Sequence, residues 1–284
     1  MPTVAVAGGS RKEILELARL SQIEFKDRVK FKVFDVEPNI DHEKTWEYIQ
    51  CESEEDMVHQ TVKSVVNKEA DILLKGGVQT HVLLKEMLKK EHDLKTQDLL
   101  SHVALVNLPA MDRQILLTDA GMNIMPTEDE LEQIINNVIE VGKAIGLEHP
   151  KVALISSAEN YNPKMPSSVL AKALTERFKD CSEAMVYGPL SLDLSLSKTA
   201  VEHKKFDGPI RGDADILVVT NIDVGNVLYK SFLLFGEAIM GGTIVGTKVP
   251  IVLTSRSDDV ESKLYALKFA LMQVTDKKTV GGYL

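Results

Sequence analysis

The sequence predicts an α/β protein built around mostly parallel sheets. Segments with strand character alternate with helix-like segments from end to end, which is typical of this fold class. Glycine pairs follow or flank three of the strand-like runs, at Gly8-Gly9, Gly76-Gly77 and Gly241-Gly242. Glycine allows tight turns and close approach of a ligand there. A chain of 284 residues has room for one large or two medium domains.

Apolar runs and helical spacing locate the individual elements. The predicted strands are 3–7, 31–36, 70–75, 103–108, 114–118, 151–156, 185–188, 214–220, 241–246 and 248–253. Strands 103–108 and 114–118 are short neighbours, so we expect them to pair antiparallel. The predicted helices are one beginning at Arg11, then 57–68, 80–90, 127–145, 225–234 and a last one that opens after Asp258 and carries apolar residues through Val274.

Composition and charge exclude several classes of protein. The net charge of −9 argues against a general nucleic-acid surface. Cys51 and Cys181 lie far apart, and the histidines are scattered, so we expect neither a disulfide framework nor a metal site. The sequence lacks both a membrane-length apolar run and a recognisable signal peptide, so the expected location is the cytoplasm. It also lacks the Gly-x-Gly-x-x-Gly fingerprint, which counts against a nicotinamide enzyme.

The most informative stretch is 249–261, where an apolar run ends in Thr254-Ser255-Arg256. A helix follows, and we expect Asp258 as its N-cap with Glu261 as capping-box partner. The unpaired N–H groups and the dipole at such a helix start favour binding of an anion, so this helix N-terminus is a candidate phosphate-binding site. The alternative is a capped helix that carries an ordinary surface arginine.

Further polar residues follow other predicted strands and should gather at the carboxyl edge of a sheet. Each segment also has a purely structural interpretation. Lys75-Gly76 can belong to a tight turn, and the Asp and Asn side chains of the other segments can cap their own loops. The candidates for substrate binding are Lys75, Gly76, Thr118, Asp119, Asn123, Asn162, Lys164, Asn226, Lys230 and Thr254.

Seven ordered segments together resemble the phosphate acetyltransferase/phosphate butyryltransferase family, and the butyryltransferase branch in particular. This resemblance covers the first part of the chain, up to about residue 70, only poorly. The matching segments are 70–76 (ADILLKG), 100–104 (LSHVA), 117–124 (LTDAGMNI), 162–166 (NPKMP), 207–219 (DGPIRGDADILVV), 225–230 (GNVLYK) and 250–256 (PIVLTSR).

The resemblance implies a two-domain α/β/α protein with the fold of isocitrate/isopropylmalate dehydrogenases. Domain one would comprise 1–126 and 248–284, and domain two 127–247, with the active cleft between them. Homodimers or higher homo-oligomers are expected. The implied reaction is acyl-CoA + phosphate ⇌ acyl phosphate + CoA, by direct attack in a ternary complex. Coenzyme A and phosphate are its substrates, and no metal or redox cofactor, nucleic acid or membrane is implied.

Carried over by position, Ser255 would lie beside the CoA sulfur and Arg256 would bind the phosphoryl group. The family aspartate that accepts the thiol proton aligns with Ser262, so Glu261 or Asp258 would have to substitute. A family arginine aligns near Leu233 or Leu234, which suggests a more apolar acyl pocket. The alternatives are a short-chain acetyltransferase, a non-catalytic acyl-CoA or phosphate-binding protein and, more remotely, a metal-assisted oxidoreductase.

Overall fold

The computed structural model describes residues 1–253 and 259–275, and its contacts fall into two units. The first unit combines Met1–Thr96 with the segment from Gly241 on, and the second is Gln97–Met240. The sequence placed the first boundary at residue 126 and the return at 248. In the structure the strand Ile115–Thr118 pairs with the strand Ile216–Val218, and contacts group residues from Gln97 on with the second unit.

The first unit contains a sheet in the order β3-β2-β1-β4-β11-β10. All neighbours along this order are parallel except β10 and β11, which are antiparallel. The carboxyl ends of β1, β2, β4 and β11 therefore share one edge. The strands are β1 (Thr3–Ala7), β2 (Lys30–Asp35), β3 (Glu47–Gln50), β4 (Ile72–Lys75), β10 (Ile239–Val245) and β11 (Ile251–Leu253).

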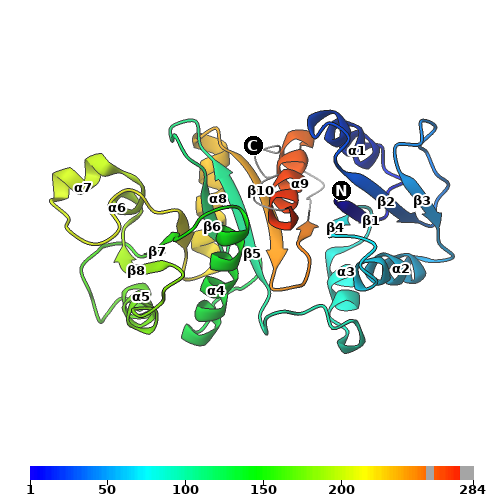
Figure 1. Cartoon of the computed structure of the whole chain (residues 1–284). Helices are drawn as coiled ribbons and strands as arrows, with labels where there is room; N and C mark the ends of the chain where they lie inside the picture. The colour runs from blue at the N-terminus through cyan, green and yellow to red at the C-terminus, as the bar shows by residue number, and fades with distance from the viewer. Residues whose placement is uncertain (254–258, 276–284) are drawn as a thin grey trace. The chain divides into compact units, whose positions relative to one another are not determined.

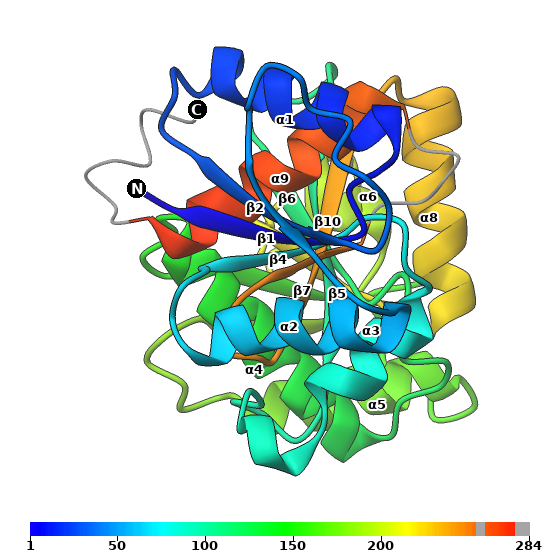
Figure 2. The same ribbon diagram turned by 90° about the vertical axis from the view of Figure 1, so that its right-hand side faces the viewer.

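Helices cover both faces of this sheet (Figure 2). Helices α1 (Lys12–Glu24) and α9 (Val260–Val274) pack together on one face. Helices α2 (Glu54–Val66) and α3 (Thr80–Met87) lie on the other, followed by the short 3₁₀ helix η1 (Lys90–His92). Burial on both faces explains why β1 and β4 are almost wholly apolar.

The second unit holds a sheet in the order β5-β6-β9-β7-β8. Strands β5 and β6 pair antiparallel, as predicted, with Val103 opposite Thr118. The remaining pairs are parallel, so β6, β7, β8 and β9 end at one edge. The strands are β5 (Ser101–Asn107), β6 (Ile115–Thr118), β7 (Lys151–Ile155), β8 (Met185–Leu190) and β9 (Ile216–Val218).

Alternate residues of these strands face two helical layers (Figure 1). Leu117, Ala153 and Leu217 join a core with one layer, which includes α6 (Leu192–Leu196), α7 (Lys198–Lys204) and α8 (Ile222–Phe235). The other layer is α4 (Glu128–Ala144) and α5 (Pro166–Arg177), which contact each other. Helix α4 begins with a capping box, in which Thr127 and Glu130 each accept the other's backbone N–H.

The N-cap of α9 differs from the prediction. Asp259, not Asp258, accepts the backbone N–H three residues on, from Ser262 at 2.7 Å. Asp258 itself lies outside the described residues. Because the cap bonds to the third helical residue, this choice moves Glu261 from the capping-box position to the second residue of the helix, where it is exposed.

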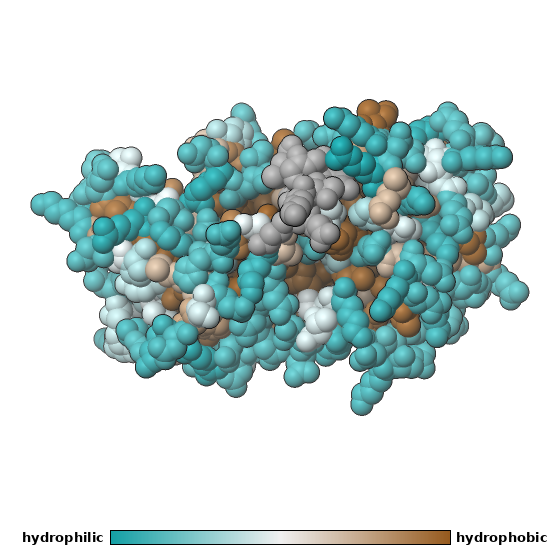
Figure 3. Space-filling model, in the orientation of Figure 1, coloured by the Kyte–Doolittle hydropathy of each residue, from teal (hydrophilic) through white to brown (hydrophobic). Residues whose placement is uncertain are grey.

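The surface carries mainly polar side chains on the face seen in Figure 3, with apolar residues in scattered patches. Within the described part of the chain, none of the helices combines the length and the apolar character needed to cross a bilayer.

Candidate active site

The second unit brings several of the predicted residues to one sheet edge. Thr118, Asp119 and Asn123 follow β6, and Asn162 and Lys164 follow β7. The helix after β9 carries the last two of this group, Asn226 and Lys230. Since these strands are parallel, the segments after them all begin at the carboxyl edge, where open α/β sheets bind ligands.

Asp119 is the hub of the loop after β6. Its carboxylate is 2% exposed. One oxygen accepts the backbone N–H groups of Gly121 and Met122, both at 2.9 Å. The other accepts the backbone N–H of His102 at 3.1 Å and the side-chain amide of Asn123 at 2.6 Å. Both oxygens are therefore engaged in shaping the loop, which fits a positioning role for Asp119.

Two neighbours of Asp119 tie the same loop to β5. The buried Thr118 hydroxyl donates to the carbonyl of His102 at 2.9 Å. The Asn123 amide donates to the carbonyl of Leu100, also at 2.9 Å. The bonds of Gly121, Met122 and Asn123 to Asp119 match the structural alternative for this segment, in which polar side chains cap their own loop.

His102 is a buried ring at this edge that the sequence had grouped with the structural histidines. Its Nδ1 atom is buried without a hydrogen-bond partner. Burial lowers the pKa of His102, although the nearby charge of Asp119 acts in the opposite direction. The ring also meets Tyr229 edge-on, with centroids 6.4 Å apart. Its position in the LSHVA segment was the only signal in the sequence.

Helix α8 packs directly on the loop that Asp119 organises. A Cβ atom added at Gly225 would lie 2.5 Å from the carbonyl oxygen of Asp119 and 2.8 Å from the Cα of Ala120. Only glycine allows this approach. Three segments that are far apart in sequence, 100–104, 117–124 and 225–230, therefore meet at one place in the second unit.

A pocket of about 640 Å³ opens at the ends of β7 and β9 in the second unit. Sequence reasoning missed most of its lining, although Ser156 ends one predicted strand and Asn221 directly follows another. Apolar side chains and hydroxyl or amide groups share the lining, and none of the lining residues is charged. They are Met125, Pro126, Ile155, Ser156, Ser157, Pro166, Ser167, Leu170, Thr220, Asn221 and Val224.

Helix starts and hydroxyl groups border this pocket. Asn221 caps α8 by accepting the N–H of Val224 at 3.0 Å. The hydroxyls of Ser156 and Ser167 lie 2.9 Å apart and share a hydrogen bond. The lining therefore combines apolar side chains with a few hydroxyl and amide groups, which is typical of small-molecule binding sites.

Four of the predicted binding residues of the second unit do not line the pocket and are exposed. Asn162 accepts the backbone N–H of Lys164 at 2.9 Å, and the Lys164 side chain is exposed. Asn226 and Lys230 are exposed on α8. These residues lie on elements at the same edge as the pocket, but they do not line it.

In the first unit, Lys75 and Gly76 end β4 at the carboxyl edge. Lys75 Nζ donates to the carbonyl of Val78 at 3.4 Å. A Cβ atom at Gly76 would lie 1.8 Å from the carbonyl oxygen of Gly8, so this glycine is required for backbone packing. Lys75 also pairs in register with Leu253 of β11. Thr254, Ser255 and Arg256 come next in the chain and lie outside the described residues.

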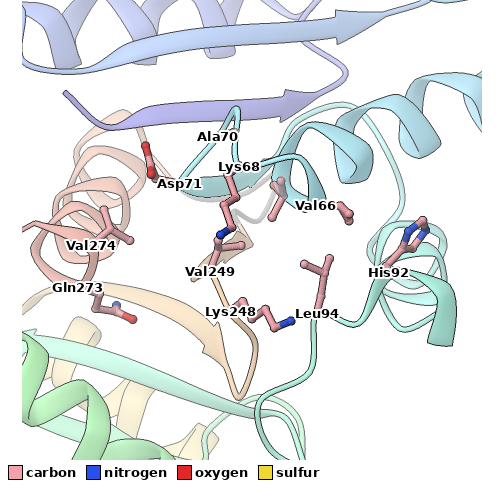
Figure 4. Close-up of a pocket in the computed structure, with 11 residues that line it drawn as sticks. Val66, Lys68, Ala70, Asp71, His92, Leu94, Lys248, Val249, Gln273 and Val274 are labelled. Carbon is pink, nitrogen blue, oxygen red and sulfur yellow. The ribbon is translucent and has the colours of Figure 1, made fainter.

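A second cavity of about 470 Å³ lies at the opposite, amino end of the first unit's sheet (Figure 4). Asp71 and Val249 line it just before β4 and β11 begin. Lys68 and Lys248 also line it, and Lys248 pairs with Asp93 at 2.7 Å. The carboxyl edge is the usual ligand side of such sheets, so we do not place the active site here.

Comparison with known proteins decides the class. A family model described as phosphate acetyl/butaryl transferase matches residues 38–271. The chain belongs to this family. It is accordingly an acyltransferase, and the resemblance carried by the seven segments is confirmed.

Individual relatives support the assignment of the chain to this family. A phosphate butyryltransferase of Clostridium acetobutylicum is 40% identical over 223 residues, 77% of this chain and 73% of the relative. A solved branched-chain phosphotransacylase of Enterococcus faecalis is 57% identical, with a TM-score of 0.94 over 96% of this chain and 99% of that one. A 4-hydroxythreonine-4-phosphate dehydrogenase of Burkholderia phymatum shares the fold at 14% identity, with a TM-score of 0.56 over 97% and 99% of the chains. The predicted α/β class with a dehydrogenase-like fold is thus confirmed.

Proposed function

We propose that this acyltransferase catalyses acyl-CoA + phosphate ⇌ acyl phosphate + CoA, with a butyryl or branched short-chain acyl group. Membership of the phosphate acetyl/butaryl transferase family supports the reaction class. The observation that carries the acyl preference is the pocket of about 640 Å³ in the second unit. Its interior is apolar and its lining uncharged, so it favours a hydrocarbon chain over a charged group.

Side-chain size in this pocket can discriminate between acyl chains. Leu170 and Val224 contribute to the lining from α5 and α8, and Ile155 contributes from the end of β7. An added methylene that fits such an apolar site gains about 1–3 kcal/mol. Two relatives, one a phosphate butyryltransferase and the other a branched-chain phosphotransacylase, support the same preference.

The proposed chemistry is acyl transfer between sulfur and oxygen without an acyl-enzyme. In the direction of thioester formation, the CoA thiol loses its proton and its sulfur attacks the acyl-phosphate carbonyl. The carbon–sulfur bond forms, the bond to the phosphate oxygen breaks, and inorganic phosphate leaves. We assign Arg256 to the phosphoryl group and its developing charge, and Ser255 to the thiol. Positioning two substrates together supplies much of the rate.

We propose that no metal or redox cofactor takes part. For the thiol proton, Glu261 remains a candidate acceptor, because its side chain is exposed in the first turn of α9. Asp259 is engaged as the helix cap. Candidate contacts to the substrates are the polar side chains at the two carboxyl edges, among them Lys75, Asn162 and Lys230.

We also propose a homodimer that forms through α8, and action in the cytoplasm. Only Gly225 of this helix is buried. Val227 is 65% exposed, Leu234 73% and Phe235 84%. Several large apolar side chains exposed on one helix indicate an interaction surface. A second copy of the chain would cover this surface with the same helix, which is the arrangement of a two-fold dimer.

The decisive experiment measures kcat/KM for acetyl-, butyryl- and isobutyryl-CoA with phosphate, by reaction of the released CoA with DTNB. We expect turnover with all three and the highest value for butyryl- or isobutyryl-CoA. Preference for acetyl-CoA would contradict the acyl assignment and identify a short-chain acetyltransferase. Absence of turnover with tight binding of acyl-CoA would identify a non-catalytic binding protein and overturn the proposed function.

A further inference from the structure

We propose that the first unit binds one divalent transition-metal ion, zinc in preference, through His59, Glu86 and His92. The sequence analysis expected no metal site, because the two histidines and the carboxylate are far apart in the sequence and lie on different elements. The site has no part in the proposed acyl transfer and would act on the folding stability of this unit.

The three donor groups converge in space. His59 comes from α2, Glu86 from α3 and His92 from η1. Nδ1 of His59 and Nε2 of His92 each lie 2.9 Å from the same carboxylate oxygen of Glu86. All three donor atoms lie within 4.8 Å of one another. Two imidazoles and one carboxylate are a ligand set that zinc binds well.

The carboxylate at the centre is nearly buried and surrounded by hydrogen-bond donors. The Glu86 side chain is 9% exposed. One of its oxygens lies 2.9 Å from both histidine nitrogens, and the other lies 2.7 Å from Lys89 Nζ. A charged carboxylate in a nearly buried place attracts a divalent cation strongly, because little water screens it.

The protonation of His92 does not oppose metal binding. Its ring is fully buried, and Nδ1 has no hydrogen-bond partner. In the metal-free state the proton resides on Nε2, facing Glu86, and Nδ1 is an unpaired acceptor. Transfer of this proton to Nδ1 frees Nε2 for a metal and leaves one unpaired ring nitrogen as before. The change of tautomer therefore adds no new unsatisfied group.

The spacing requires only small adjustments. Zinc at about 2.1 Å from each donor in tetrahedral geometry separates the donors by about 3.4 Å. Each of the two histidine–carboxylate distances has to lengthen from 2.9 Å by about half an ångström toward that value. His59 is 41% exposed, so the fourth position can hold a water molecule and gives the ion a route in.

Lys89 is the group that competes with the metal. Its Nζ atom lies 2.7 Å from the other oxygen of Glu86. This lysine is 45% exposed, so it can move into solvent when the metal neutralises the carboxylate. With zinc bound, α2, α3 and η1 would be linked through one ion, and the folded state would gain the free energy of metal binding.

The test is zinc titration of protein without an affinity tag, by isothermal calorimetry after dialysis against a chelator. We expect one zinc per chain for the wild type. Glu86→Gln and His59→Gln should each weaken binding about 100-fold, because one of three protein ligands is lost. His81→Gln removes an exposed histidine from α3 and should leave binding unchanged. Cobalt(II) should also show the visible absorption bands of tetrahedral coordination in the wild type and in His81→Gln, and not in Glu86→Gln or His59→Gln.

His59 is half-exposed, so His59→Gln should fold, and its Tm without metal should match that of the wild type. Zinc should raise the Tm of the wild type and of His81→Gln, and not that of His59→Gln. Absence of zinc binding in the wild type, or equal binding by wild type and His59→Gln, would overturn the assignment. Neither result would affect the proposed acyl transfer, which is measured separately with acyl-CoA.

Discussion

The Asp119 carboxylate accepts the backbone N–H of His102 at 3.1 Å, which joins the loop after β6 to the start of β5. Asp119→Ala would remove this acceptor and leave the N–H groups of Gly121 and Met122 without theirs. We expect a loss of about 3 kcal/mol in the free energy of unfolding, since one hydrogen bond to a charged group contributes about 1.5–3 kcal/mol. Urea unfolding measures it, with the exposed Asp180→Ala as control. Equal stability of the two variants would contradict the role of Asp119.

Arg256→Ala should lower kcat/KM by about 10²-fold, the cost of removing a charged contact to the transition state. Ser255→Ala should be damaging but milder. Steady-state kinetics with the preferred acyl-CoA and phosphate measure both effects. Arg28→Ala, which removes an exposed arginine of the first unit, should retain wild-type kinetics. Unchanged kinetics of Arg256→Ala would remove this arginine from the mechanism.

Leu170→Phe should narrow the pocket of the second unit and shift the acyl preference toward acetyl. We expect the ratio of kcat/KM for butyryl-CoA over acetyl-CoA to fall about tenfold, the effect of one misfitted methylene or more. Val169→Phe is the matched control, because Val169 is the preceding residue of α5, is 39% exposed and does not line the pocket. An equal shift in both variants would show that the pocket does not hold the acyl chain.

Phe235→Glu should convert the proposed dimer to a monomer, because it places a charge on the exposed apolar face of α8. Sedimentation velocity at matched protein concentrations measures the change. Ile23→Glu provides the comparison, as Ile23 is a single apolar residue of α1 that is 75% exposed. A Phe235→Glu protein that still sediments as a dimer would move the interface elsewhere.

Cys51 should resist alkylation in the folded protein. Burial, followed by the charge of Asp56, raises the pKa of Cys51 to about 11. About one thiol in 10³ would then be ionised at pH 8, and the thiolate is the reactive form. Mass spectrometry after iodoacetamide treatment should find Cys181 modified first, and Cys51 modified only in urea or as the pH approaches 11. Equal rates for both thiols in the folded state would contradict this expectation.

Most regular elements could be predicted because their signals are local. Strand β1, helix α4 with its capping box and the antiparallel pair β5–β6 all follow from apolar periodicity and turn residues. Strand β3 escaped because it is a four-residue edge strand with polar Glu47 and Gln50 at its ends. The N-cap of α9 could not be chosen, since Asp258 and Asp259 are consecutive and either one can cap a helix.

Contacts between residues far apart in the sequence explain why the unit boundary and parts of the candidate site could not be predicted. Strand β6 belongs with the second unit because it pairs with β9, far along the chain, and local patterns do not report such a partner. The gathering of polar residues at one edge followed from parallel strands alone. The hydrogen bond between Asp119 and the backbone N–H of His102 could not be foreseen, because the two residues are seventeen positions apart in the sequence.

The close contact of Gly225 with Asp119 has a consequence for motion during turnover. Backbone atoms of α8 and of the loop meet here without an intervening side chain, so neither can slide or tilt alone without a collision. If substrate binding moves Asn226 or Lys230, Asn123 has to move with them, because α8 and the loop then behave as one rigid body. The hinges of any such movement must therefore lie outside this pair of segments.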